Sequence, residues 1–285
     1  MGADMITVSA AESKTISSQE YNEFCSFLET SCGIVLGDNK QYLVNSRLKR
    51  LLKDHSLDNL SNLVGILKSN SDALLREHTI DAMTTNETSW FRDNYPYEVL
   101  KNDLVKEIVS TGKKDLRIWS SACSSGQEPY SIAMILHEYS MLHPGSIGRT
   151  SILATDISPT MLDEAKTGIF DSMSIARGLS EERKKLFFEP DEGRWKVRDI
   201  LKNKITFKEA NLMKSFNANG KFDIIFCRNV LIYFAIPLKQ DIINRMAESL
   251  NPGGYLILGG TESVSNYTDR FEPVRYQNGI IYRLK

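Results

Sequence analysis

The chain has 285 residues, of which 41% are apolar and 25% are charged, and its formal net charge is −1. This length accommodates about two domains with a buried core, and the composition excludes disordered and fibrous chains. The balanced charge argues against a protein whose whole surface binds nucleic acid or anionic membrane, although it is compatible with local patches. We therefore expect no nucleic-acid partner.

Cysteine and histidine usage predicts neither a metal site nor a disulfide framework. The four cysteines show no C-x-x-C spacing, and only four histidines are present. This pattern is typical of reduced thiols in a cytosolic protein. No segment approaches the roughly 20 apolar residues of a membrane span, and the N-terminus has no apolar run long enough for a signal peptide. We expect a cytoplasmic chain without membrane insertion.

Residues 1–82 are predicted to form an all-helical N-terminal domain. Apolar residues recur at helical spacing, as in Tyr21, Phe24 and Leu28, and no strand pattern is evident before Thr79. Residues 83–96 then combine polar capping residues, aromatics and a proline, which is typical of a linker. We expect this linker to contribute to a ligand site.

From residue 97 to residue 285, short apolar runs alternate with helical patterns. This alternation predicts an α/β domain with a mostly parallel, doubly wound sheet and helices on both faces. Asn251–Gly254 is expected to end the last helix and open the next strand. The expected strands are Leu116–Ser120, Ser151–Asp156, Ile205–Ala210, Phe222–Cys227, Tyr255–Gly259 and Gly279–Leu284, and the expected helices are Pro129–Tyr139, Pro159–Thr167 and Pro237–Leu250.

One segment interrupts this alternation. Between Leu186 and Arg198, two short strand patterns surround the turn residues Glu189–Gly193. The segment predicts a small antiparallel β-subdomain, inserted in the α/β domain at about residues 180–204.

The loop from Leu116 to Ile132 runs from an apolar strand through small residues into a helix start. Pro129 suits the first helical position, and the small side chains allow the backbone to approach a ligand closely. A dinucleotide pyrophosphate is usually bound by G-x-G-x-x-G, but this loop contains only Gly126. The loop therefore favours an adenosine ligand without phosphates, of which S-adenosylmethionine is the common one.

Polar side chains follow four predicted strands, where an open α/β sheet binds its ligand. Asp156 is placed to accept ribose hydroxyls, or alternatively begins the next helix. Asn211 can bind the edge of an adenine while Leu212 packs on the face of the adenine ring. Alternatively, Asn211 is a turn residue. Glu128 can hold an ammonium group, or it is a helix-start acid. The strand-end side chains are Glu128, Asp156, Asn211, Leu212, Arg228 and Asn229.

Two further segments carry candidate site residues. A buried Arg228 needs a carboxylate or backbone acceptors, so a structural ion pair competes with a ligand contact. Tyr233 can direct its hydroxyl at a reaction centre or belong to the core. In the linker, Asn86, Thr88 and Arg92 can anchor a lid over the cofactor, with plain helix capping as the competing interpretation.

These segments resemble the chemotaxis receptor methyltransferases, the CheR family, over nearly the whole chain. The resemblance implies a Rossmann-like methyltransferase sheet that methylates glutamate side chains on the cytoplasmic helices of chemoreceptors. S-adenosylmethionine would be the cofactor and S-adenosylhomocysteine the product. The matching motifs are Met83–Arg92, Trp119–Ser131, Ala154–Ile157, Phe226–Phe234 and Asn251–Gly254. The residues that it implies at the cofactor are Asn86, Thr88, Arg92, Glu128, Asp156, Asn211, Leu212, Arg228 and Asn229, and those near the reacting groups are Arg92 and Tyr233.

Receptor binding is expected at a basic helix face. Arg47 and Arg50 are three residues apart and Lys53 continues the face, which is either a solvated surface or, as the resemblance implies, a docking surface for acidic receptor helices. The hairpin turn is short compared with family members that bind a receptor tail. We therefore expect an enzyme that is independent of a tail peptide, and a monomer.

A glutamate acceptor, with a pKa of about 4.3, is ionised at neutral pH, so no catalytic histidine is expected. Three other functions compete with glutamate methylation. The chain can be a methyltransferase for a small molecule or RNA, although its balanced charge gives RNA no support. It can also be a non-catalytic signalling module that binds the cofactor. A nicotinamide dehydrogenase is the weakest alternative, because the glycines are missing.

Overall fold

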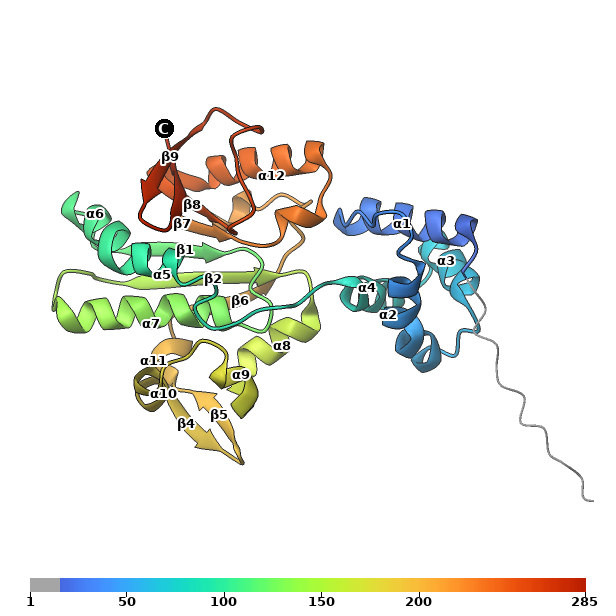
Figure 1. Cartoon of the computed structure of the whole chain (residues 1–285), viewed down its shortest axis with the longest axis horizontal. Coiled ribbons are helices and arrows are strands. Elements are labelled where there is room, and N and C mark those ends of the chain that lie inside the picture. Colours follow the sequence, from blue (N-terminus) through green and yellow to red (C-terminus); the bar gives the residue numbers. More distant parts are fainter. Residues whose placement is uncertain (1–15) are drawn as a thin grey trace, which may run out of the picture. The chain divides into compact units, whose positions relative to one another are not determined.

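The computed structural model describes residues 16–285, so residues 1–15 of the predicted helical domain lie outside the described residues. The chain forms two compact units (Figure 1). The helical unit comprises residues 16–31 and Leu36–Met83, and the sheet unit comprises Cys32–Val35 and Thr84–Lys285. Within the described part of the chain, no helix is long and apolar enough to cross a membrane.

The helical unit confirms the predicted all-helical domain. It contains α1 (Ser18–Cys32), α2 (Gln41–Asp54), α3 (Leu60–Ser69) and α4 (Ala73–Met83). Asn59 caps α3 by accepting the N–H of Asn62, and Asn70 ends the helix in a left-handed conformation with φ 52°. Leu48 and Leu63, at helical spacing in the sequence, are fully buried in the unit.

The sheet unit is built on seven strands in the order β6-β2-β1-β7-β8-β10-β9. Strands β6 to β8 in this order are parallel, and β10 is antiparallel to both of its neighbours. The chain leaves β1 toward β2 on one side and returns to β7 on the other, so β1 and β7 flank the switch point where such sheets bind ligands. The strands are β1 (Leu116–Ser120), β2 (Thr150–Asp156), β6 (Ile205–Glu209), β7 (Phe222–Cys227), β8 (Leu250–Leu258), β9 (Phe271–Tyr276) and β10 (Gly279–Leu284).

Helices cover both faces of this sheet, as expected for a doubly wound domain. Successive strand residues point to opposite faces, so Ile118 packs in a cluster with Ile132 of α7, whereas Trp119 packs in another cluster with Ile242 of α12. Figure 1 shows α7 and α12 on opposite sides of the strands. The helices of the unit are α5 (Tyr95–Val99), a π-helix (Leu100–Leu104), α6 (Val105–Ser110), α7 (Gln127–Leu142), α8 (Pro159–Thr167), α9 (Ser172–Ala176), α10 (Glu181–Phe187), α11 (Asp199–Lys202) and α12 (Ile236–Ser249).

The predicted hairpin is present and belongs to a three-stranded antiparallel sheet in the order β3-β5-β4. Its strands are β3 (Ile169–Phe170), β4 (Phe188–Asp191) and β5 (Arg194–Val197). The turn is shorter than expected, because β4 continues to Asp191 and only Glu192 and Gly193 connect the strands. Both have positive φ, 46° and 81°, as in the type I′ turns that are common in two-residue hairpins.

The bounds of two elements differ from the sequence prediction by two residues or more, and one strand of the seven-stranded sheet was missed. Strand β8 begins at Leu250 and includes Asn251–Gly254, with an irregular register near Ile224 of β7. Helix α7 begins at Gln127, so Pro129 lies within its first turn, where a missing N–H costs no intrahelical bond. Strand β9 was not predicted, because it carries two exposed charged residues and a proline, a pattern that edge strands tolerate.

Candidate active site

The loop after β1 is folded tightly around a glycine. Gly126 directly precedes α7 with φ 99°, and a Cβ there would lie 3.0 Å from Cβ of Ala165 in α8 and 3.1 Å from the ring of Tyr130. Only glycine combines this backbone conformation with this packing. The first turn of α7 is thereby fixed beside the carboxyl end of β1, and it carries Glu128.

Asp156 ends β2 and ties the β1 loop to the second strand. Its Oδ2 accepts the N–H of Ser124 at 2.7 Å, and its Oδ1 accepts the N–H of Ser158 at 3.0 Å. The alternative role at the start of α8 belongs to Ser158, whose hydroxyl accepts the N–H of Met161. An ionised carboxylate has about four acceptor positions, so a residue of this type can accept ligand hydroxyls as well as backbone N–H groups.

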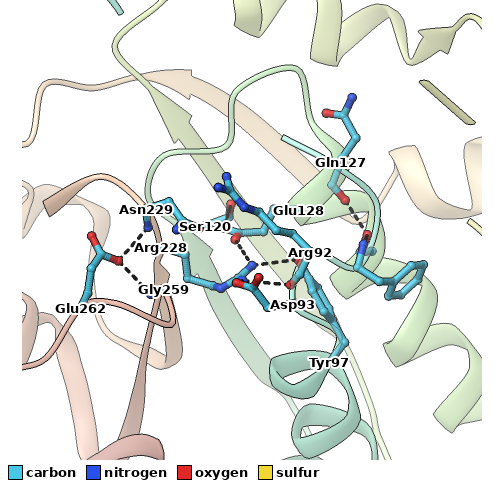
Figure 2. A network of polar contacts seen from close by, with 12 residues as sticks. Arg92, Asp93, Tyr97, Ser120, Gln127, Glu128, Arg228, Asn229, Gly259 and Glu262 are labelled. Atoms are coloured by element: carbon cyan, nitrogen blue, oxygen red, sulfur yellow. Dashed lines mark hydrogen bonds and ion pairs between the residues drawn. The ribbon is translucent and has the colours of Figure 1, made fainter. Parts of the chain in front are cut away.

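Arg228, directly after β7, is the centre of a buried polar network (Figure 2). Its side chain is only 2% exposed. Its Nη2 donates to Oδ2 of Asp93 at 2.6 Å and to the carbonyl of Arg92 at 2.9 Å. Its Nη1 lies 3.3 Å from Oε2 of Glu128 and 3.5 Å from the hydroxyl of Tyr97. The structural ion pair considered from the sequence is therefore present, with two carboxylates instead of one.

Glu128 is buried between β1 and Arg228. The hydroxyl of Ser120 donates to its Oε1 at 2.8 Å. Burial raises the pKa of this carboxyl above its usual value, while the charge of Arg228 and the hydrogen bond from Ser120 act in the opposite direction. Glu128 and Asp93 share the guanidinium of Arg228, so a cationic ligand group beside Glu128 would meet a carboxylate that has only part of one cation as its partner.

Arg92 lies at the margin of the same cluster. It is half-buried, its Nη1 donates to the carbonyl of Glu87 at 2.9 Å, and its charge acts on the carboxyl of Glu128. The carboxylate of Glu128 can bind an ammonium group, and the guanidinium of Arg92 beside it can bind a carboxylate. Together they fit the two charged groups of an amino acid.

The linker is anchored firmly in the sheet unit. The ring of Trp90 packs edge-on against Phe170 and Phe188, with centroid distances of 4.9 and 5.3 Å. Phe91, Asp93 and Asn94 all have positive φ, between 49° and 66°. Non-glycine residues in this region are strained, so the contacts of the linker must hold it in place.

Two of the predicted linker residues, Asn86 and Thr88, lie in the extended part of this segment and are half-buried. The carbonyl of Asn86 accepts the hydroxyl of Ser124, at 2.8 Å, which places it against the β1 loop. The structure thus brings Asn86, Arg92, Glu128 and Arg228 to one edge of the sheet.

Asn211 adopts the turn that the sequence offered as its alternative role. Its Oδ1 accepts the N–H of Met213 at 2.9 Å, directly after β6, and Leu212 is buried. Asn229, after β7, is left-handed with φ 57°. Tyr233 ends the short 3-10 helix Leu231–Tyr233 and is half-buried against the core.

Sequence reasoning missed several members of this site. Asp93, Tyr97 and Ser120 complete the Arg228 network, and Glu262 binds the backbone of the loop after β7. Only Asp93 left a signal, since it is a carboxylate that directly follows Arg92 in an aromatic segment. The others lie far from Arg228 in sequence and are brought together only by the fold.

The basic residues predicted for docking differ in their surroundings. Arg47 of α2 is half-buried, and its Nη1 donates to the carbonyl of Met83 at the end of α4. Arg50 is 92% exposed and pairs with Asp54 at 3.4 Å, and Lys53 is exposed. The face therefore offers Arg50 and Lys53 to solvent more than Arg47.

Comparison with known proteins identifies the family. Residues 86–280 match the family model described as the CheR methyltransferase, SAM binding domain, and residues 19–84 match the CheR methyltransferase, all-alpha domain. The chain belongs to the CheR methyltransferase family. The predicted resemblance and the predicted cofactor, S-adenosylmethionine, are thereby confirmed.

The chain matches curated relatives over most of its own length and of theirs. The chain is 53% identical to "Chemotaxis protein methyltransferase 1" of Vibrio cholerae over 95% of the chain and 98% of the relative. It is 46% identical to "Chemotaxis protein methyltransferase 1" of Pseudomonas aeruginosa, covering 93% and 98%. It is 33% identical to the "Chemotaxis protein methyltransferase" of Salmonella typhimurium, covering 95% and 92%. The chain is thus a methyltransferase of chemotaxis.

The residues of the site fit this cofactor. Asp156 offers acceptors at the end of β2, the cluster around Glu128 favours a cation, and the β1 loop has no phosphate-binding glycine pattern. Among residues 16–285, no group of three or more His, Cys, Asp or Glu side chains is placed to hold a metal ion.

Proposed function

We propose that the chain transfers the methyl group of S-adenosylmethionine to glutamate side chains of chemoreceptors, giving methyl esters. The observation that carries this proposal is that, within residues 16–285, no histidine directly follows a strand of the parallel sheet or lies in the first turn of α7. His55 and His78 belong to the helical unit. In the sheet unit, His137 lies ten positions after Gln127, about 15 Å along α7, and His143 follows the far end of that helix. An acceptor that must lose a proton would need a general base, and the carboxylates at the site, Glu128 and Asp93, are paired with Arg228. An ionised glutamate acceptor needs no base.

The site residues would bind, orient and exclude water. The cofactor, when bound, supplies a methyl group on a cationic sulfur. We assign Asp156 to the ribose and Glu128 to the ammonium group, with Asn86, Thr88, Asn211, Leu212, Arg228 and Asn229 completing the cofactor site. Arg92 and Tyr233 are assigned to the reacting carboxylate. An anion and a cation become two neutral products, so a dry, aligned site accelerates the reaction.

Arg228 acts on the cofactor indirectly in this proposal. Its Nη1 and Nη2 already bond to Glu128, Asp93 and the carbonyl of Arg92, and its side chain is 2% exposed. It therefore orients Glu128 and the backbone of Arg92 toward the cofactor, as a positioning residue.

Receptor docking is assigned to the basic face of α2. Arg50 and Lys53 project a positive charge that acidic receptor helices would attract, and Arg47 contributes to a lesser extent because it is bound to the carbonyl of Met83. Receptor helices of this kind lie in the cytoplasm, so we assign the chain to that compartment. We also assign it a monomeric state.

The antiparallel sheet supports independence from a receptor tail peptide. Strand addition needs free main-chain donors on an outer strand. In the two-residue hairpin, Asp191 pairs with Arg194 next to the turn and directs its main-chain groups at β5. The main-chain groups of Pro190 and Phe188 therefore point away from β5, toward the outer edge of β4. Pro190 has no N–H, the N–H of Phe188 donates to the carbonyl of Lys184, and the Phe188 carbonyl accepts Nε of Arg198 at 3.0 Å. Within Phe188–Asp191, the outer edge has no open donor.

The test uses the full chain with methyl-labelled cofactor and membranes that contain chemoreceptors. We expect incorporation of label that mild base releases as methanol, because esters are base-labile and N-methyl groups are not. A base-stable label, or none, contradicts the proposal. Asp156→Ala should incorporate no label, and Asp103→Asn, a change at an exposed carboxylate, should match the wild type. Receptors with a truncated tail should be methylated at the same rate if the enzyme is tail-independent.

A further inference from the structure

Glu262 lies just beyond β8, and its carboxylate accepts four backbone N–H groups. Oε2 accepts from Asn229 at 2.7 Å and from Gly259 at 2.8 Å. Oε1 accepts from Val230 at 3.1 Å and from Ile232 at 3.3 Å. Figure 2 shows the carboxylate facing Asn229 and Gly259. One side chain thus joins the end of β8 to the loop that follows β7.

The loop that Glu262 holds is the one that carries candidate site residues. It begins directly after Arg228, passes through the left-handed Asn229, and ends at Tyr233. The N–H groups of Val230 and Ile232 lie at the start of the 3-10 turn, where no carbonyl of the turn can accept them. Charge-assisted bonds from a carboxylate satisfy them more strongly than neutral acceptors would.

The contact between Glu262 and the loop is also tightly packed. A Cβ at Gly259 would lie 2.7 Å from Oε2 of Glu262 and 2.8 Å from Nδ2 of Asn229. Any larger residue would push the carboxylate or the amide away, so the chain has glycine where the two groups meet.

We propose that Glu262 is a positioning residue for methyl transfer, which fixes the loop from Asn229 to Tyr233 relative to the strand ends. This inference rests on the proposed function and names the residue that orders the loop. Glu262→Gln replaces one acceptor oxygen by an NH₂ donor that faces backbone N–H groups. The substitution therefore loosens the loop without changing its size.

The test measures loop order and turnover separately. In Glu262→Gln, amide hydrogen exchange over residues 228–234 should be at least about tenfold faster at Asn229, Val230 and Ile232, because one of the two oxygens that accept these N–H groups is lost. Turnover should fall by about 10- to 100-fold, since a misplacement of about 1 Å can cost a factor of 100. In a Tyr233→Phe background, the same substitution should cost much less, because both changes act on one group. Glu262→Asp, which retains the carboxylate, should recover part of the turnover.

The control is Glu272→Gln, an exposed carboxylate on β9, for which exchange and turnover should match the wild type. All rates are measured at a temperature at which circular dichroism shows the variants to be folded. Unchanged exchange over residues 228–234, turnover within twofold of the wild type, or losses that multiply in the double variant would overturn the inference. Failure of the proposed function is distinguishable, because it shows as absence of base-labile label in the wild type.

Discussion

Replacing Arg228 by Met tests whether the buried network holds the sheet unit together. Arg228→Met keeps an unbranched apolar stem and removes the guanidinium with its charge. It breaks the ion pairs to Asp93 and Glu128, at 2.6 and 3.3 Å, and the bond to the Arg92 carbonyl. Asp93 is 40% exposed in its side chain and regains water, whereas Glu128 is 11% exposed and stays buried without its partner.

The expected cost follows from that uncompensated carboxylate. Removing one member of a buried ion pair costs about 3–5 kcal/mol of unfolding free energy. For a domain of this size, each kcal/mol lowers Tm by about 2–4 °C, so we expect a fall of about 6–20 °C. Adding Glu128→Gln removes the unpaired charge, and the double variant should therefore be at least about 1 kcal/mol more stable than the sum of the single effects predicts.

Tryptophan fluorescence during urea unfolding measures the unfolding free energy of the sheet unit alone. All three tryptophans, Trp90, Trp119 and Trp195, belong to the sheet unit, so the helical unit does not contribute to the signal. Arg275→Met, at an exposed position of β9, is the matched control and should change stability by less than about 0.5 kcal/mol. A cost below about 1 kcal/mol for Arg228→Met, or strict additivity with Glu128→Gln, would refute the reasoning.

Three further predictions address binding and turnover. Asp156→Ala should abolish cofactor binding in calorimetry, whereas Tyr233→Phe should bind normally and turn over more slowly; equal affinity and turnover in both would contradict the assignments. The cofactor affinity should weaken as pH falls, starting above the ordinary pKa of a glutamate, because burial raises the pKa of Glu128 and protonation removes the partner of the ammonium group. Because the folded pKa of Glu128 is raised, its protonation does not itself destabilise the fold. A Glu128→Gln variant with an unchanged pH dependence of cofactor affinity would argue against this role of Glu128. Finally, Arg50→Ala with Lys53→Ala should weaken the salt dependence of receptor methylation, and an unchanged dependence would place docking elsewhere.

Much of the fold was predictable because local patterns determine it. Strands β1, β2, β6 and β7 are short apolar runs bounded by turn residues, and each was predicted to within one residue at either end. Strand β9 was not, because an edge strand needs no continuous apolar pattern. The two-residue β3 was missed for a related reason, since so short a strand exists only by pairing with β5.

The sequence predicted several residues of the site but not the contacts between them. The rule that ligands bind beyond the carboxyl ends of parallel strands selected Glu128, Asp156 and Arg228. The sequence gives no sign that Arg228 contacts Asp93 and Tyr97, which lie more than 130 positions away. Long-range contacts between polar groups follow from the packing of whole elements, so only the structure reveals them.

The strained linker and the Arg228 network explain each other. Phe91, Asp93 and Asn94 have positive φ angles, and such backbone conformations cost about 1–3 kcal/mol each in residues other than glycine. Arg228 opposes this cost with bonds to the Asp93 carboxylate and the Arg92 carbonyl, and bonds to charged groups contribute about 1.5–3 kcal/mol each. The same guanidinium also holds Glu128. One residue after β7 therefore sets both the path of the linker and the orientation of the carboxylate assigned to the cofactor, which explains why a side chain with so few free donors lies at the centre of the site.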